Sequence, residues 1–314
     1  MSAIAQCLSH SPVAYARPLE ASRQSMFDAA LRDARSAMDS FKPDAVVMFG
    51  PDHYNGVFYN MMPPICVGAQ AVGIGDYGTL KGALPVDSSA AEALHMALLA
   101  ADFDVAISHD LHMDHGFTQS LQQLFGDPPP FIPIFINCAA QPVARCARII
   151  ALGRKIGEIF KARGGRVAFL GSGGLSHDAP LPSMATTPPG PARRKLIEWR
   201  MLEPAERAER ETRTLEAADK FAAGDSPLAP LNGRWDREIM DLIGRGEWNR
   251  LAELKDEDIT RLGGRSGHEI RTWLAAFAAL SVFGPYQIEQ SAYFEAPEWI
   301  VGFGALRGRA VAAS

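Results

Sequence analysis

Residues 45–53 read AVVMFGPDH, a run of five apolar residues followed by glycine, proline, aspartate and histidine. An apolar run this short, ended by glycine and proline, is typical of a β-strand that is buried on both faces. Residues 166–177 repeat the arrangement, because RVAFL runs there into GSGGLSH. Strands buried on both faces occur in sheets that helices cover on both sides. The two segments therefore predict an α/β fold with a central, mostly buried sheet flanked by helices on both faces.

On either side of these segments, apolar runs alternate with helical patterns. Further strands are expected at residues 3–8, 105–107 and 131–136. Helices are expected at residues 19–41, 90–101 and 143–162. Pro133 lies inside the third of these strands and suggests an edge strand or a bulge, because proline has no backbone N–H to donate to a neighbouring strand.

The C-terminal third of the chain is expected to be mainly helical. The Pro-rich loop at residues 178–191 is long enough to form a lid or a subunit contact. Residues 193–223 form a charged helical segment that is broken near Pro204, and the charges are expected to form a solvated helix face. A helix pair within residues 235–254 and a final apolar helix follow. The aromatic residues at 293–303 are expected to pack against the rest of the chain.

Composition restricts the class of protein. The chain of 314 residues is expected to fold as one domain over residues 1–314. It has 31 Lys and Arg against 36 Asp and Glu, hence a net charge of −5, and no basic stripe. This excludes an extended nucleic-acid surface. The four cysteines form no C-x-x-C pair, which argues against a thiolate zinc site. We recognise no signal peptide and no membrane span, so the cytoplasm is the expected compartment.

Three histidines lie just beyond expected strand ends: His10, His53 and His177. In open α/β sheets, ligands bind where strands end and loops begin. Each histidine alone is compatible with an ordinary hydrogen-bonded turn. Together, His10 and His53 could direct two imidazoles from neighbouring strand ends to one point, which is what a metal site requires.

Glu269 allows two interpretations. Ser266 and Glu269 have the spacing of a capping box, in which the glutamate reaches back to the first backbone N–H of a helix. Local sequence favours that interpretation. The alternative is a metal ligand, because two histidines and one carboxylate leave half of an octahedron open, as in non-haem iron(II) sites that use dioxygen.

Two further segments contain candidate functional residues. Residues 108–117 hold His109, His112 and His115, and we expect one of them to point into a pocket while an aspartate orients a neighbour. A self-contained metal site is the weaker alternative for this segment. Residues 171–177 lack the spacing of a dinucleotide loop, a P-loop or a nucleophile elbow. Their glycines allow close backbone approach beside His177.

At this point the sequence resembles the type III extradiol dioxygenases, the superfamily of the protocatechuate 4,5-dioxygenase catalytic subunit. Five segments carry the resemblance: residues 8–12 (LSHSP), 51–55 (PDHYN), 114–117 (DHGF), 171–177 (GSGGLSH) and 268–273 (HEIRTW). Shorter segments agree with it: residues 61–64 (MMPP), 297–300 (PEWI) and 302–304 (GFG). The similarity extends to about Leu306 and covers nearly the whole chain.

The resemblance implies a role for each site residue. It implies Fe(II) bound by His10, His53 and Glu269, and so favours a ligand over a helix cap at Glu269. It also implies that His115 donates a proton during ring cleavage and that His177 accepts one from the catechol. The rival interpretations are a zinc hydrolase with the same ligands and a non-catalytic metal-binding scaffold.

The resemblance also implies the substrates and the assembly. The expected reaction is extradiol cleavage, with O2, of a catechol that carries an acidic side chain. The expected substrates are 3-(2,3-dihydroxyphenyl)propionate and 2,3-dihydroxycinnamate, giving a product of the 2-hydroxy-6-oxo-nonadienedioate type. A carboxylate needs a cationic partner, and the candidates are Arg193, Arg194, Arg265 and Arg271. A homo-oligomer such as a tetramer is expected.

Overall fold

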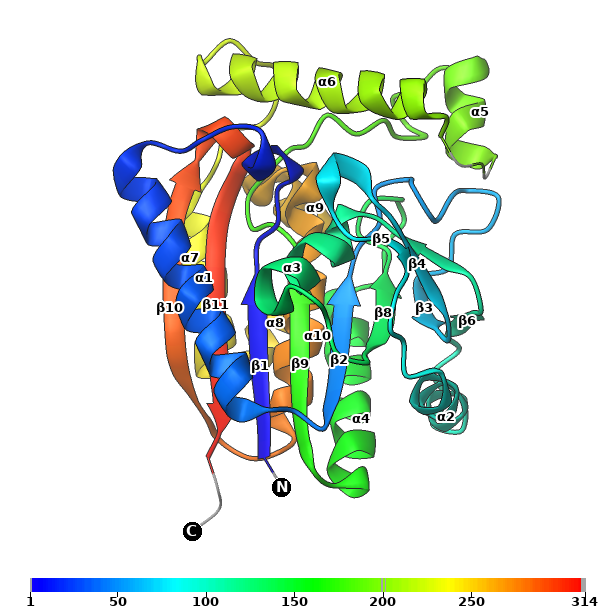
Figure 1. Cartoon of the computed structure of the whole chain (residues 1–314), viewed down its shortest axis with the longest axis vertical. Coiled ribbons are helices and arrows are strands. Elements are labelled where there is room, and N and C mark those ends of the chain that lie inside the picture. The colour runs from blue at the N-terminus through cyan, green and yellow to red at the C-terminus, as the bar shows by residue number, and fades with distance from the viewer. Residues whose placement is uncertain (1, 199, 201, 312–314) are drawn as a thin grey trace.

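The computed structural model describes residues 2–198, 200 and 202–311. Its main sheet is built from strands β1 (Ser2–Leu8), β2 (Ala45–Gly50), β3 (Ile65–Gly68), β6 (Ala106–Ser108), β8 (Ile132–Ile136), β9 (Arg166–Ser172), β10 (Tyr286–Ala296) and β11 (Val301–Ala310). Within the described residues this sheet has eight strands in the order β10-β11-β1-β9-β2-β8-β3-β6. The strands β1, β9, β2 and β8 run parallel to one another and form the centre of the molecule (Figure 1).

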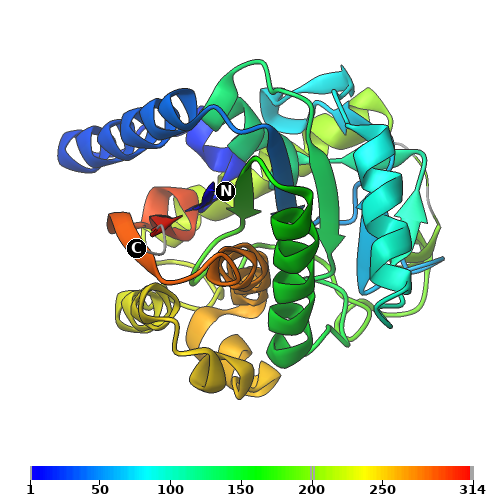
Figure 2. The same cartoon turned by 90° about the horizontal axis from the view of Figure 1, so that it is seen from below.

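Helices cover both faces of this sheet, as the sequence predicted. One face carries α1 (Ala21–Phe41) and α3 (His115–Phe125), and the other carries α2 (Ser88–Leu99), α4 (Cys146–Arg163) and α10 (Ile270–Ser281) (Figures 1 and 2). The strands bury side chains on both sides. In β2, Val47 and Phe49 pack in the core under α4 and α10, whereas Val46 and Met48 pack in the core under α1 and α3. Continuous apolar runs are therefore the expected sequence for these strands.

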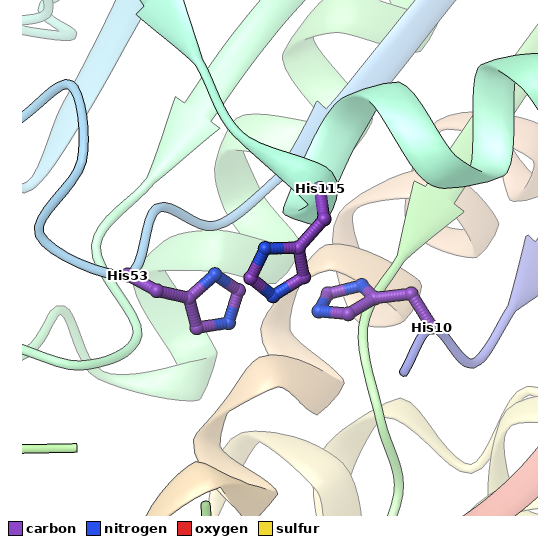
Figure 3. Close-up of side chains that lie close together, drawn as sticks. All are labelled: His10, His53 and His115. Carbon is purple, nitrogen blue, oxygen red and sulfur yellow. The ribbon is translucent and has the colours of Figure 1, made fainter. Parts of the chain in front are cut away.

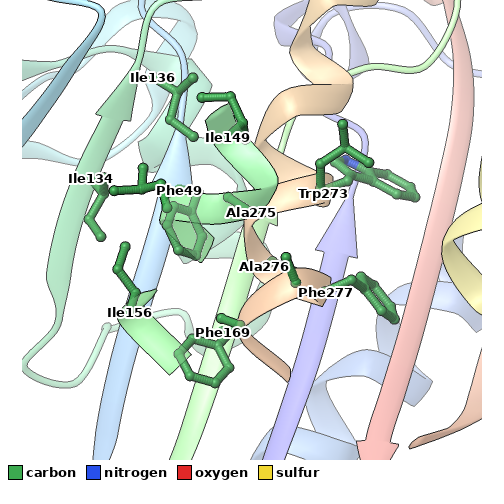
Figure 4. Close-up of a cluster of buried hydrophobic side chains, with 14 of the residues drawn as sticks. Phe49, Ile134, Ile136, Ile149, Ile156, Phe169, Trp273, Ala275, Ala276 and Phe277 are labelled. Atoms are coloured by element: carbon green, nitrogen blue, oxygen red, sulfur yellow. The ribbon is translucent and has the colours of Figure 1, made fainter. Parts of the chain in front are cut away.

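The helices α4 and α10 pack closely against each other (Figure 4). A Cβ atom built on Gly153 would lie 2.4 Å from the carbonyl oxygen of Ala275, and one on Gly157 would lie 2.4 Å from that of Ala279. Only glycine allows the two backbones to approach so closely. Residues Ile270 to Leu280 of α10 are all buried, so this helix is fixed within the core. Its first residue follows directly on Glu269.

The helical C-terminal third is confirmed, with two strands added at its end. It contains α6 (Pro204–Ala222), α7 (Gly233–Arg245), α8 (Trp248–Ala252) and α9 (Asp256–Gly263), after a short α5 (Pro191–Ile197). The charged segment is interrupted before Pro204, as predicted. The aromatic tail packs, with Phe294, Trp299 and Phe303 buried. Phe294 lies in β10, Phe303 lies in β11 and Trp299 lies in the 3-10 turn between them (η4, Pro297–Trp299). The strand β11 pairs antiparallel with β1, and β10 pairs with β11. These strands were not predicted.

Two smaller features also differ from prediction. A second sheet, formed by β5 (Lys81–Ala83), β4 (Ala71–Ile74) and β7 (Leu111–Met113), lies beside the main one. The expectation that Pro133 marks an edge strand is wrong, because β8 lies between β2 and β3. Pairing with β3 covers only Ile134 to Ile136, so the N–H that Pro133 lacks is not needed there.

None of the helices in the described ranges has the length and apolar character of a membrane span.

Candidate metal centre

The parallel strands β1, β9 and β2 bring three histidines to one edge of the sheet. His10 follows β1, His53 follows β2, and His177 comes a few residues after β9, the strand between them. The carboxyl ends of parallel strands lie at the same edge, which is why residues this far apart in sequence become neighbours. The imidazole rings of His10 and His53 have centroids 5.3 Å apart and meet edge to face (Figure 3). The predicted convergence of these two side chains is thus present.

Glu269 completes this group from the other end of the chain. Its carboxylate Oε2 lies 3.5 Å from His10 Nε2, and its Oε1 lies 3.2 Å from His53 Nε2. The same Oε1 lies 3.3 Å from His177 Nε2. All four side chains are buried. The three residues expected to hold a metal therefore surround one point, with His177 beside them.

The capping box at Glu269 is not formed. The carboxylate Oε2 instead accepts a hydrogen bond from the backbone N–H of Gly174 at 2.8 Å. The N–H of Ser266, which a capping box would join to Glu269, donates to the carbonyl oxygen of His177. Residues Arg265–Glu269 form a 3-10 turn (η3) before α10. Local spacing suggested a cap, but the groups that attract this carboxylate are distant in sequence.

The outer nitrogens of both candidate histidine ligands have protein partners. His10 Nδ1 lies 3.0 Å from the hydroxyl of Ser172, and His53 Nδ1 lies 3.0 Å from Oδ2 of Asp114. Such contacts fix the ring orientation and leave Nε2 for a metal. Among the residues that the structure describes, His10 Nε2 is buried and has no hydrogen-bond partner. A buried nitrogen without a partner is costly unless a ligand or ion completes it, so the residues present fit a bound cation.

Electrostatics support the same conclusion. Burial lowers the pKa of His10 to about 3, so its imidazole is neutral and able to coordinate. For His53, burial lowers the pKa, but the carboxylates of Asp114 and Glu269 outweigh it and raise the pKa well above its usual value. For Glu269, burial raises the pKa, but the charge of His177 and hydrogen bonds from His177 and His53 outweigh it and hold the pKa well below its usual value. A divalent cation bound here would likewise favour the charged form of the buried carboxylate.

His115 enters the group from the first turn of α3. Its ring stacks on that of His53 with centroids 4.4 Å apart (Figure 3). Its Nδ1 lies 2.5 Å from Oδ2 of Asp76, a buried carboxylate in the turn η2 (Asp76–Gly78). Ligand atoms of His10, His53 and His115 all lie within 4.8 Å of one another. The geometry therefore permits His10 and His53 to be completed by either Glu269 or His115. A third possible group of ligands joins Asp76, Asp114 and His115.

The glycines of residues 171–177 allow the close packing that the sequence suggested. A Cβ atom on Gly174 would lie 2.4 Å from the His177 ring, and one on Gly173 would lie 2.8 Å from Cβ of Glu269. His177 Nδ1 lies 3.1 Å from the carbonyl oxygen of Leu175, which leaves Nε2 directed at Glu269. Burial lowers the pKa of His177, but the Glu269 carboxylate outweighs it and raises the pKa.

The segment 108–117 does not form a separate metal site. His109 is exposed beside Glu92, whereas His115 is buried in the central group. Asp114 orients His53, as expected for an aspartate of this segment. The weaker alternative is therefore wrong.

A cavity of about 780 Å³ opens from this centre. His10, His53, His115 and His177 contribute to its wall. Of the arginines expected to bind the carboxylate of the substrate, Arg265 lines the cavity, whereas Arg193 and Arg194 are not among its lining residues. Arg271 is also excluded, because it is buried and bonded to Asp256 and to the carbonyl oxygen of Ala144. Three cations of α6, which was expected to be a solvated helix, also line this cavity: Arg207, Arg210 and Arg213.

Comparison with known proteins extends this description. Residues 4–304 match the family model described as the catalytic LigB subunit of aromatic ring-opening dioxygenase. A 2,3-dihydroxyphenylpropionate/2,3-dihydroxicinnamic acid 1,2-dioxygenase of Rhodococcus jostii is 44% identical over 304 residues, which cover 96% of each chain. A protein of the same description from Burkholderia vietnamiensis is 46% identical, over 97% of this chain and 96% of its own. A solved structure of an uncharacterized Escherichia coli K12 protein matches with TM-score 0.49 and 16% identity, covering 97% and 98% of the two chains, a similarity too low to support an inference.

Proposed function

The chain belongs to the family of catalytic LigB subunits of aromatic ring-opening dioxygenases and is an extradiol dioxygenase, and we propose from that membership its substrate, its metal and its site residues. The proposed substrate is 3-(2,3-dihydroxyphenyl)propionate, with 2,3-dihydroxycinnamate as a second substrate, because relatives 44% and 46% identical carry both in their names. Oxygen is the co-substrate, and the product is of the 2-hydroxy-6-oxo-nonadienedioate type.

The proposed metal is Fe(II), held by His10, His53 and Glu269. Two imidazoles and one carboxylate form the ligand set typical of non-haem iron(II) sites that use dioxygen. Ferrous iron, when bound, supplies the redox chemistry by which a catechol and dioxygen react. We prefer Glu269 to His115 as the third ligand because the Glu269 carboxylate faces Nε2 of both His10 and His53.

The remaining two histidines are placed to move protons. His177 Nε2 faces the centre beside Glu269 and would accept the proton of a catechol hydroxyl. Its raised pKa depends on the negative charge of Glu269, and a cation bound to that carboxylate would lower it again. His115 is held by Asp76 through Nδ1, so its Nε2 would donate a proton to an oxygen atom derived from dioxygen as the O–O bond breaks.

The observation that carries this proposal is the buried His10 Nε2, which has no hydrogen-bond partner within the described chain and lies 3.5 Å from the Glu269 carboxylate. The test is anaerobic loading with Fe(II), followed by oxygen uptake and visible absorbance with a panel of substituted catechols. The expected result is oxygen consumption equimolar with catechol and a yellow product, most efficiently with 3-(2,3-dihydroxyphenyl)propionate. A protein that retains zinc and consumes no oxygen with any catechol would contradict the proposal and favour the hydrolase alternative.

Three further expectations belong with this proposal. The whole chain, residues 1–314, would act as one catalytic domain, including positions 1, 199, 201 and 312–314 that lie outside the described residues. We also propose a homo-oligomer such as a tetramer, which light scattering of the purified protein would test. The proposed compartment is the cytoplasm, where reducing conditions help to keep iron ferrous.

A further inference from the structure

One face of α6 covers the cavity that opens from the metal centre. Figure 1 shows α6 lying across the end of the main sheet where β1 and β2 end. Its residues 207, 210, 211 and 214 recur with helical spacing and all line the cavity. Arg207 donates to the carbonyl oxygen of Ile74 at 2.7 Å, and Thr214 accepts a hydrogen bond from the Tyr77 hydroxyl at 3.0 Å. This helix was expected to be a solvated surface, but its inner face closes the site.

The cations around this cavity differ in their partners. Three of them are paired with carboxylates: Lys195 with Glu206 at 3.2 Å, Arg213 with Glu209 at 3.3 Å, and Arg265 with Asp178 at 2.6 Å. The other two are Arg207 and Arg210. Across the part of the chain that the structure describes, these two donate only to neutral oxygen acceptors. A cation that faces a cavity without an anionic partner can bind an anionic ligand at little cost in existing ion pairs.

Arg210 is the one that reaches the metal centre. It donates through Nη2 to the carbonyl oxygen of His53 and through Nη1 to Oδ1 of Asn55 at 2.9 Å and to the carbonyl oxygen of Tyr54 at 3.3 Å. The guanidinium therefore lies against the loop that carries a candidate ligand. A guanidinium has five N–H donors in one plane, so donors remain for a bidentate contact with a ligand.

The acidic residues near Arg210 have other partners and do not serve as its anionic partner. Glu206 and Glu209 are engaged by Lys195 and Arg213, as above. Glu211 accepts a hydrogen bond from the backbone N–H of Tyr77 at 2.9 Å. Each of these carboxylates lines the same cavity, so an anionic ligand meets them too and needs a strong, directed partner.

We propose that Arg210 binds the carboxylate of the substrate side chain, with Arg207 as a second positive charge one turn away on α6. This inference rests on the proposed function and adds the residue that makes the site prefer acidic catechols. The catechol ring lies over the histidines, and the side chain extends toward α6. The bonds from Arg210 to the His53 loop fix the guanidinium relative to the metal ligands, so the carboxylate contact also sets the position of the ring.

The test separates binding from turnover. Binding of 3-(2,3-dihydroxyphenyl)propionate and of its neutral carboxamide is measured on Zn(II)-loaded protein, and kcat/KM for both is measured on Fe(II)-loaded protein. The variants are Arg210→Met, Arg210→Lys and, as a matched control on the same helix, Lys220→Met, because Lys220 does not line the cavity. Arg210→Met should weaken binding of the acid about 10- to 100-fold and change binding of the amide by no more than about twofold. Lys220→Met should keep the wild-type preference for the acid over the amide.

Each alternative result has a distinct meaning. Equal losses for acid and amide in Arg210→Met would make Arg210 a support of the His53 loop and overturn the inference. A wild-type protein that binds both compounds equally would overturn it as well, even if ring cleavage is observed. If Arg210→Met fails to hold metal, Arg210→Lys decides, because lysine keeps the charge without the planar fork. In Arg210→Lys, a partial loss of the preference for the acid over the amide supports the inference, and an unchanged preference overturns it. Absence of cleavage with preserved acid preference in Zn(II) protein would refute the proposed function alone.

Discussion

Asp114 contacts His53 at two points: its Oδ2 accepts the backbone N–H at 2.9 Å and lies 3.0 Å from the ring Nδ1. The other oxygen, Oδ1, accepts the N–H of Gly116 at 2.8 Å and so caps the first turn of α3. That turn carries His115. One buried carboxylate therefore fixes both a candidate metal ligand and a candidate acid, and it joins the end of β2 to the start of α3.

Replacing Asp114 with asparagine should weaken the metal site. Asn keeps the size of the side chain but loses the negative charge that orients the His53 ring and strengthens its Nε2 as a ligand. We expect about a 10- to 100-fold loss of Fe(II) affinity, measured by competition with a chelator. Asp110→Asn is the control, since that aspartate is exposed. Unchanged affinity in Asp114→Asn would mean that the contact is only structural.

Glu269→Ala should lose both metal affinity and activity, because it removes the carboxylate that faces His10 and His53. Metal content after loading and dialysis measures the first effect, and oxygen uptake measures the second. Thermal melting is recorded for the same samples. A variant that remains iron-replete and active but melts at lower temperature would show that Glu269 stabilises the start of α10 and does not coordinate.

His115→Ala and His177→Ala should each keep iron yet lose about 10²–10⁴-fold in turnover, the usual share of a general acid or base. Metal analysis of His115→Ala also distinguishes the two ligand sets that share His10 and His53. If that variant loses its metal while Glu269→Ala keeps it, the third ligand is His115. Near-normal turnover in either histidine variant would remove that residue from the catalytic role proposed for it.

Asp76→Asn should impair His115 without removing it. Asp76 lies 2.5 Å from His115 Nδ1, and asparagine can still form a hydrogen bond but carries no charge. We expect lower kcat with unchanged metal content, because the uncharged amide holds the His115 ring less firmly than the carboxylate does. A kcat identical to that of the wild type would show that Asp76 merely packs against the ring.

The sequence predicted the parts of the site that depend on strand ends. His10 and His53 could be predicted because each follows a short apolar run, and parallel strands bring their ends to one edge. Glu269 could not be assigned from local spacing, since its partner Gly174 is 95 residues away. The strand β11 was missed because glycines such as Gly302 and Gly304 weaken a strand pattern. Arg210 was missed because a charged helix gives no sign of which face is turned inward.

Gly153→Ala should lower the stability of the protein, although alanine is the better helix former by about 1 kcal/mol. The added Cβ would lie 2.4 Å from the backbone oxygen of Ala275, so α4 and α10 would have to separate. Overpacking of this kind costs about 1–3 kcal/mol, and each 1 kcal/mol lowers Tm by about 2–4 °C in a large domain. Gly244→Ala in α7 is the matched control, because its nearest new contact is a side-chain carbon of Ile288 at 3.3 Å.

Since Glu269 directly precedes α10, separation of α4 and α10 should also weaken Fe(II) binding in Gly153→Ala. Fe(II) binding in Gly244→Ala should be unchanged. A Gly153→Ala protein that melts at or above the wild-type temperature would contradict the close contact between the helices.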